Sequence, residues 1–248
     1  MSKHVAMIMP MAGRGSRFAK EGEILPKPLI QIAGKPFFYW ATLGIVREVP
    51  GIQLVYIVLQ EHVEKFAIDH KIRDYFPDAE VVAIAEVTSG ALETALKAST
   101  HVDQEASIIV NDCDHAFSYS RLNSACEALS SGVDGFLSHF QSREPHFSFA
   151  EYSGDGALVR TAEKDAISNL AIAGIYGFSS FRALSLASER YALDCPYPEL
   201  FISGVYNEML KKGALVRGFS VDFHIPFGTP EEYGRALGRV AELESLEQ

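Results

Sequence analysis

The sequence predicts an α/β fold with a mixed, mainly parallel central sheet. Short apolar runs rich in Val and Ile alternate with segments whose apolar residues have helical spacing. The runs are apolar on both faces, which is typical of parallel strands that helices cover on both sides. With 248 residues and 48% hydrophobic content, the chain can form one large core. We therefore expect a single domain, with its ligand site beyond the carboxyl ends of the strands.

The first half of the chain, residues 1–135, holds the clearest alternation of strands and helices. Each predicted strand is a short apolar run, and each predicted helix carries apolar residues three and four positions apart. We expect strands at His4–Met9, Leu54–Leu59, Glu80–Ile84 and Ser107–Val110, with helices at Phe37–Val46 and His62–Phe76.

The second half, residues 136–248, has a different texture. Its shorter alternating segments predict antiparallel strands added to the sheet, and its last segment is charged and amphipathic, which favours a terminal helix. We expect strands at Gly135–Phe140, Phe147–Tyr152 and Leu158–Ala162, with helices at Phe181–Arg190, near Ser203–Lys212 and at Pro230–Glu247.

Composition and charge exclude several kinds of partner. The formal net charge of −10 argues against nucleic acid, because affinity for a phosphate backbone depends on clustered Lys and Arg. No apolar stretch approaches the roughly eighteen residues of a membrane span, and the N-terminal segment lacks the apolar core of a signal peptide. The cysteines form no CxxC spacing or paired framework, as expected in a reducing compartment. We therefore expect a cytoplasmic protein without nucleic-acid or membrane partners.

A glycine-rich loop, PMAGRGSRF, follows the first predicted strand. Gly13, Gly15 and Ser16 offer backbone amides that can surround a phosphate, and Arg17 adds a permanent positive charge. A tight strand-to-helix turn with a surface arginine is the simpler alternative. A Rossmann dinucleotide site is excluded, because phenylalanine replaces the third glycine and no acidic residue ends the second predicted strand.

Two lysines next to prolines follow this loop, in PKPL at residues 26–29 and in GKP at residues 34–36. A glycine loop, an arginine and these two motifs in this order resemble the signature of the sugar-1-phosphate nucleotidyltransferases of the glucose-1-phosphate thymidylyltransferase type, roughly AGGxGTRL, PKPL and GKP. The resemblance implies a three-layer, Rossmann-like and GT-A-like nucleotidyltransferase fold. The nucleotide would bind over residues 1–135. The sugar phosphate would bind over residues 136–248, which contribute a small antiparallel extension and the C-terminal helix.

The same resemblance implies roles for the residues of the loop. Arg17 would hold the triphosphate and the leaving pyrophosphate, and Lys27 would bridge the α-phosphate and the sugar phosphate. These residue types suit in-line attack on the α-phosphorus, because cations and amide donors must meet the negative charge of the transition state. The nucleotide-binding residues that the resemblance implies here are Met11, Ala12, Gly13, Arg14, Gly15 and Ser16.

The segment from Glu86 to Ala95 places small polar residues and a glycine before a predicted helix. By resemblance this region contacts the base, through residues that include Thr88 and Gly90. A plain N-cap at Thr88 or Ser89 explains the segment about as well. Family members often carry glutamine where Glu86 stands, so the choice of base remains open.

Two carboxylates stand at the carboxyl end of the fourth predicted strand. Asp112 and Asp114 supply oxygen ligands, which suit Mg²⁺ bound jointly with substrate phosphates. The family's metal aspartate can be matched to either residue, and we favour Asp114. The other is expected to serve a turn or a cap. His115 is expected to be a neighbour rather than a ligand, since imidazole suits softer metals.

A charged pair, Glu163 and Lys164, precedes the run SNxAxxGxY at residues 168–176. The combination resembles the sugar-phosphate half of thymidylyltransferase-type sites. It implies that Glu163 accepts hydrogen bonds from hydroxyls, that Lys164 meets the phosphate, and that Asn169 and Gly174 belong to the same subsite. Taken alone, a Glu–Lys pair is usually a solvated surface pair of little energetic value.

The segment VDFHIPFGTPEEY, residues 221–233, resembles the family's closing motif. A second metal-binding aspartate commonly stands two residues before GTPE, but here Pro226 holds that place. Asp222 or His224 can substitute, or one aspartate with substrate oxygens can suffice. A structural alternative is a helix start, with Thr229 as N-cap and Glu232 at the third helical position.

These motifs predict an enzyme that transfers a nucleoside monophosphate from a nucleoside triphosphate to a sugar 1-phosphate, with Mg²⁺, and releases pyrophosphate. Surface polysaccharide synthesis is the expected pathway, and homo-oligomers are common among such enzymes. One alternative is a cytidylyltransferase for a non-sugar phosphate such as phosphocholine, with Phe147, Tyr152 and Tyr176 around the acceptor. Another is a catalytically silent nucleotide-sugar-binding protein, which Pro226 favours and which Lys27 with Arg17 argues against.

Overall fold

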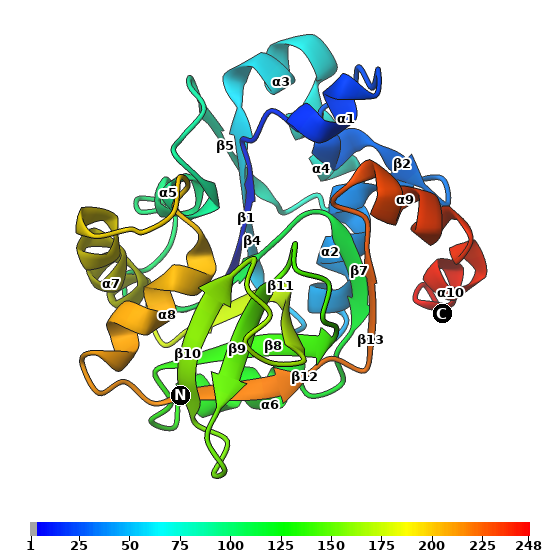
Figure 1. Cartoon of the computed structure of the whole chain (residues 1–248). Helices are drawn as coiled ribbons and strands as arrows, with labels where there is room; N and C mark the ends of the chain where they lie inside the picture. The colour runs from blue at the N-terminus through cyan, green and yellow to red at the C-terminus, as the bar shows by residue number, and fades with distance from the viewer. Residues whose placement is uncertain (1–3) are drawn as a thin grey trace.

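A computed structural model describes residues 4–248, and its centre is a large sheet (Figure 1). The nucleus of the sheet is parallel: β6, β1, β4 and β5 lie side by side in that order. Hydrophobic runs form these strands, and the central residues of the first, second and third of them along this order are buried on both faces, whereas β5 at the edge is only partly buried. Their bounds are Val5–Met11 (β1), Gln53–Leu59 (β4), Glu80–Ile84 (β5) and Ser107–Asn111 (β6).

The second half extends this sheet, mainly with antiparallel pairs. β11 lies antiparallel to β6 and also pairs with β8 and β9, and β10 pairs with β9. β12 adds a parallel pair to β8. The bounds are Gly135–Gln141 (β8), Ser148–Tyr152 (β9), Leu158–Glu163 (β10), Leu170–Phe178 (β11) and Val216–Ser220 (β12). The predicted antiparallel extension is thus present.

Helices cover both faces of the sheet and complete three layers. One core cluster joins the first face to α5, α7 and α8, and a second joins the opposite face to α2, α4 and α6. The helices are Ser16–Lys20 (α1), Phe37–Val46 (α2), Gln60–Phe66 (α3), Ile68–Tyr75 (α4), Ala91–Leu96 (α5), Leu122–Leu129 (α6), Phe181–Leu193 (α7), Ile202–Leu210 (α8), Pro230–Leu237 (α9) and Val240–Ser245 (α10). Within residues 4–248, none of them is long and apolar enough to cross a bilayer.

Two predicted helices are each divided in two. The helix expected over His62–Phe76 breaks at Ala67, whose left-handed backbone (φ 48°) ends α3 before α4 begins. The helix expected over Pro230–Glu247 breaks after α9, at Gly238 and Arg239. Hydrophobic spacing continues across both breaks, so periodicity alone does not reveal them.

The C-terminal segment returns to the N-terminal half. Strand β13 (Phe223–Pro226) pairs with β7 (His115–Ser118), and α9 and α10 then pack against α1 and α2. The rings of Phe37 and Phe227 lie 4.4 Å apart, and Tyr233 contacts Phe18 and Phe37. This third core cluster brings α9 beside α1 and α2 (Figure 1).

Candidate active site

The glycine loop and Lys27, the lysine of the PKPL motif, contact each other directly. The loop leaves β1 and enters α1 through Gly15, which has a positive φ of 59°. A methyl group at this position would lie 3.0 Å from Cβ of Lys27, so this close approach and the positive φ both favour glycine. Lys27, which stands between Pro26 and Pro28, is the first residue of a 3-10 turn over Lys27–Leu29. The loop and the lysine therefore pack directly against each other.

Two cavities adjoin at the carboxyl ends of β1 and β6. The first has a volume of about 460 Å³, and the second has a volume of about 250 Å³. The first cavity is lined by residues that include Met11, Ala12, Gly13, Arg14, Thr88 and Gly90, and the second by residues that include Arg17, Glu163, Lys164 and Gly174. Both cavities share Lys27, Ala91, Asp112, Asp114, Glu199 and Phe201. Most of the predicted site residues therefore lie around one continuous space.

An ion pair stands where the two cavities meet. Nζ of Lys27 lies 2.7 Å from Oδ2 of Asp114, and the two side chains are 28% and 22% exposed. Burial disfavours the charge on each group, but the pairing outweighs it. The pKa of Lys27 is therefore raised, and the pKa of Asp114 is lowered. Both partners stay charged, and the junction holds a fixed cation.

Asp112 is the second carboxylate of the junction. Its backbone N–H donates to the carbonyl of Gly174, and a methyl group at position 174 would lie 2.8 Å from its Oδ2. Gly174 has a φ of 76°, so the position favours glycine for its backbone as well. Burial and the neighbouring charge of Asp114 raise the pKa of Asp112 to about 8. A further cation bound next to Asp112 would therefore favour the charged form of its carboxylate.

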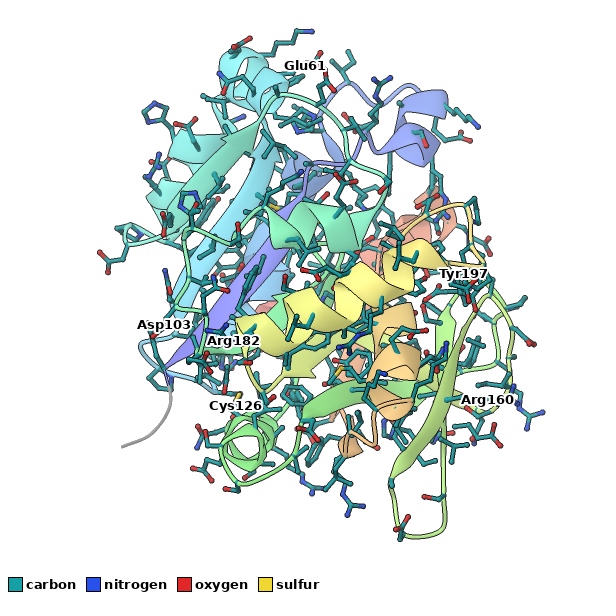
Figure 2. All side chains as sticks on the ribbon, turned by 90° about the vertical axis from the view of Figure 1, so that its left-hand side faces the viewer. Glu61, Asp103, Cys126, Arg160, Arg182 and Tyr197 are labelled. Carbon is teal, nitrogen blue, oxygen red and sulfur yellow. The ribbon has the colours of Figure 1, made fainter. Side chains whose placement is uncertain are left out.

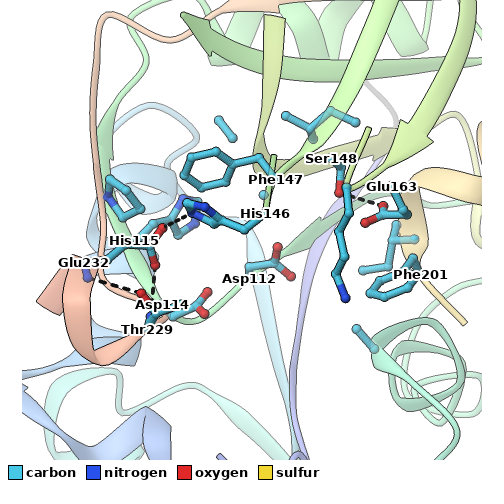
Figure 3. A pocket seen from close by; sticks show the side chains of 18 of the residues that line it. Asp112, Asp114, His115, His146, Phe147, Ser148, Glu163, Phe201, Thr229 and Glu232 are labelled. Atoms are coloured by element: carbon cyan, nitrogen blue, oxygen red, sulfur yellow. Dashed lines mark hydrogen bonds and ion pairs between the residues drawn. The ribbon is translucent and has the colours of Figure 1, made fainter. Parts of the chain in front are cut away.

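Glu163 ends β10 at the wall of the second cavity. Its Oε1 accepts hydrogen bonds from the hydroxyls of Ser148, at 2.6 Å, and Ser203. Burial raises the pKa of Glu163, although these hydroxyls favour its charged form. Figure 3 shows Asp112 between Glu163 with Phe201 on one side and Asp114 with Thr229 on the other.

Lys164 has a left-handed backbone conformation that residues other than glycine rarely adopt. Its φ is 55°, and its N–H donates to the carbonyl of Phe147 at 3.0 Å. Its Nζ lies 5.3 Å from the ring centre of Phe201, within cation–π range. Strained residues of this kind persist where surrounding contacts hold them, and they cluster at functional sites.

The opposite wall of the second cavity comes from the start of α9. Thr229 and Glu232 form the reciprocal capping box that the sequence predicts. The buried carboxylate of Glu232 also lies 2.8 Å from Nε2 of His146, which belongs to the loop between β8 and β9. A methyl group at Gly228 would lie 2.4 Å from Oδ2 of Asp114, so this wall packs tightly against the ion pair.

The oxygen ligands at the junction suit Mg²⁺ only together with substrate. Asp112 and Asp114 are the hard donors that Mg²⁺ prefers, and Mg²⁺ commonly keeps waters and phosphate oxygens as its other ligands. Within residues 4–248, no group of three or more His, Cys, Asp or Glu side chains is arranged to hold a metal. Pro226 lines the second cavity without a ligand atom in its side chain. The residues present fit a metal held mainly by substrate oxygens.

The two residues considered as substitutes for the missing carboxylate lie in different surroundings. Asp222 accepts a hydrogen bond from the N–H of Ser120 at 2.6 Å, and it lines neither cavity. His224 lines the second cavity, and its Nε2 lies 3.2 Å from Nδ1 of His115. Burial lowers the pKa of both histidines, that of His115 to about 4. The pair therefore adds no positive charge at neutral pH.

The segment from Glu86 to Ala95, here named the base-side segment after its predicted role, is held by contacts with main-chain groups. The hydroxyl of Thr88 donates to the carbonyl of Gly90, and Ser89 bonds Glu93, so neither hydroxyl caps α5. Gly90 lies against the backbone of Leu200, where a methyl group would meet the carbonyl oxygen at 2.6 Å. The helix-cap alternative therefore does not explain these residues.

Some predicted residues lie outside both cavities, and some cavity residues were not predicted. Asn169 donates to Gln141 at 2.7 Å, and Ser16 is exposed on α1. Glu199 and Phe201 line both cavities, although the connection between α7 and α8 that carries them has no motif. His146 was also missed, because its loop has no distinctive spacing.

Comparisons with known proteins support the architecture. No family model and no curated protein matches the chain. Among solved structures, a nucleoside-diphosphate-sugar pyrophosphorylase from Vibrio cholerae has 26% identity, a TM-score of 0.79, and coverage of 94% of this chain and 99% of its own. The inositol-1-phosphate CTP transferase from T. maritima has 14% identity, a TM-score of 0.76 and coverage of 98% and 97%.

A UDP-glucose pyrophosphorylase from Acinetobacter baumannii is also similar, with 16% identity, a TM-score of 0.70 and coverage of 94% of this chain and 92% of its own. The last two structures are alike in fold alone, whereas the Vibrio cholerae protein also shares about a quarter of its residues. These structures confirm the resemblance to the sugar-1-phosphate nucleotidyltransferases that the sequence motifs predict, and they show that the chain has their fold.

Proposed function

We propose that this protein transfers a nucleoside monophosphate from a nucleoside triphosphate to a sugar 1-phosphate and releases pyrophosphate. One observation carries the proposal: two adjoining cavities meet at Lys27, Asp112 and Asp114. A two-substrate transfer needs a separate space for each substrate and a cation where they react. The solved structures that share the fold include nucleotidyltransferases that act on different phosphorylated acceptors.

The residues around the junction suit the parts of this reaction. The loop amides would hold the β- and γ-phosphates, and Thr88 with Gly90 would face the base. Arg17, which lines the second cavity, would meet the triphosphate from that side of the junction. Lys27 would lie between the α-phosphate and the incoming phosphate oxygen, where charge gathers during in-line attack. Mg²⁺, when bound at Asp112 and Asp114 with phosphate oxygens, would neutralise further charge. Glu163 and Lys164 would orient the acceptor.

This assignment divides the chain into residues 1–135 for the nucleotide and residues 136–248 for the acceptor. The start of α9 is an addition to that division, since Thr229 and Glu232 approach the ion pair of the first half. The expected use of the product in surface polysaccharide synthesis rests on the family resemblance alone.

A non-sugar phosphate is the second candidate acceptor. The second cavity is lined by the rings of Phe147, Tyr176 and Phe201 and by the carboxylates of Glu163 and Glu199. Aromatic faces and carboxylates together also suit a cationic group such as choline. Tyr152, the third aromatic residue considered for this role, packs against His139 outside the cavity.

The test is pyrophosphate release over a grid of nucleoside triphosphates and phosphorylated acceptors, with and without Mg²⁺. The grid contains sugar 1-phosphates and phosphocholine, so the two candidate acceptors give different patterns. The variant Lys27→Ala is the control for turnover at this site. Nucleotide binding without turnover in any combination would refute the transferase and favour a silent binding protein.

A further inference from the structure

The connection between α7 and α8 contacts both halves of the candidate site. It comprises residues 194–201, and two of its residues, Glu199 and Phe201, line both cavities. Figure 2 shows Tyr197 beyond the end of α7. Glu199 and Phe201 line the cavities directly, and the other contacts of this segment join the two sides of the site to each other.

One end of the connection is joined to the base-side segment by main-chain contacts. The N–H of Leu200 donates to the carbonyl of Ser89, and the N–H of Leu92 donates to the carbonyl of Leu200, each at 3.1 Å. Both main-chain polar groups of Leu200 are therefore bonded to residues 89 and 92. Gly90 lies between them, and a methyl group there would meet the backbone of Leu200 at 2.6 Å and 2.7 Å. Movement of residues 89–92 must therefore move Leu200.

The other side of the connection holds the acceptor pair. The N–H of Glu163 donates to the phenolic oxygen of Tyr197 at 3.2 Å. The ring of Tyr197 packs edge-on against Phe201 at 5.8 Å, and Phe201 lies beneath Nζ of Lys164. The positive φ of Lys164 makes this pair costly to hold without such support. Tyr197 and Phe201 thus fix both members of the pair.

We propose that residues 197–201 are a positioning element that couples the base-side segment to the Glu163–Lys164 pair. The inference rests on the proposed function for what the two sides bind. Ordering of residues 89–92 by a nucleotide then orders Leu200, and through Tyr197 and Phe201 it orders the acceptor pair. Binding of either substrate lowers the entropic cost of binding the other, and this coupling is reciprocal.

The first experiment measures backbone amide exchange in the full-length protein without ligand. Tyr197→Phe removes only the hydroxyl that Glu163 contacts, and Gly90→Ala presses on Leu200 from the far side. Each variant should raise exchange at the Glu163 amide about fivefold, the effect of losing one ordinary hydrogen bond. The double variant should show no larger rise than either single one. Tyr152→Phe, which removes a buried hydroxyl without a hydrogen-bond partner in residues 4–248, should leave that amide unchanged.

The reciprocal measurement keeps the test decisive if Gly90→Ala does not fold. Tyr197→Phe should also raise exchange at the amides of Leu92 and Leu200. A rise confined to Glu163, or independent effects that multiply in the double variant, would overturn the coupling and leave Tyr197 a local structural contact.

A nucleotide experiment separates this inference from the proposed function. The Mg²⁺ complexes of ATP, CTP, GTP, UTP and dTTP are added in turn, and exchange is followed at residues 88–92 and 158–166. An effective nucleotide should protect both segments in the native protein and only the first in Tyr197→Phe. If none protects residues 88–92, the proposed function fails, and the ligand-free measurement still decides the coupling.

Discussion

Replacement of Lys27 by alanine should abolish most turnover while leaving the fold nearly intact. The ion pair with Asp114 is partly solvent-exposed, at 28% and 22% of the two side chains, so its loss costs about 1–2 kcal/mol of folding free energy, between exposed and buried pairs. Without the cation the pKa of Asp114 rises, and uptake of a proton at the Asp112–Asp114 pair limits the loss. A preorganised charge at the transition state is worth about 10²–10³ in kcat.

The assay compares kcat for pyrophosphate release with the midpoint of thermal unfolding for the same samples. Lys35→Ala is the matched control, because Lys35 is the other lysine next to a proline and lines neither cavity. Its Nζ lies 5.1 Å from the ring centre of Tyr39 and 5.2 Å from that of Tyr75, so its loss should cost about 1 kcal/mol of stability and no rate. If Lys27→Ala lowered kcat less than tenfold, or if both variants lowered it equally, the assignment of Lys27 would be wrong.

Three further predictions concern the junction. Gly174→Ala should lower kcat by at least about tenfold, because its methyl group meets Asp112 at 2.8 Å; steady-state kinetics and a melting curve separate this from unfolding. In Mg²⁺ titrations of pyrophosphate release, Asp112→Ala and Asp114→Ala should each raise the Mg²⁺ concentration for half-maximal rate, and equal, mild effects would refute both as ligands. Neutral His115 stabilises the fold above pH 6.5, and this contribution falls as pH drops toward its folded pKa of about 4. The free energy of unfolding, measured with urea, should therefore fall less in His115→Gln than in the native protein between pH 6.5 and about pH 5, by on the order of 2 kcal/mol. Equal falls in the two proteins would contradict the lowered pKa of His115.

The local sequence pattern predicts the bounds of helices and strands that no backbone break interrupts. The helix Phe37–Val46 and the strand Glu80–Ile84 have the predicted bounds. Ala67 defeats the same reasoning, because a left-handed alanine leaves no mark in hydrophobic spacing. Strands β7 and β13 were also not predicted, since each is short and gains its partner only from the other.

The sequence predicts candidate site residues where the chemistry requires special residue types in a fixed order. The site residues of the glycine loop, Lys27, the aspartates and the Glu163–Lys164 pair were predicted in this way, and apart from Gly15 and Ser16 of the loop they line the two adjoining cavities. Glu199 and Phe201 could not be found, because tertiary contacts alone bring their connection to the site. Asp222 shows the converse limit: proximity in sequence to the closing motif does not bring its side chain to the cavity.

The return of the C-terminal segment to the N-terminal half has a consequence for synthesis on the ribosome. Thr229 and Glu232 complete the wall beside Asp114, and α9 and α10 cover Phe18 and Phe37. A nascent chain that already contains the loop, Lys27 and both aspartates therefore still lacks one wall of its site. The site can assemble only after α9 has left the ribosomal tunnel, so a shorter nascent chain should be inactive even if its sheet has formed.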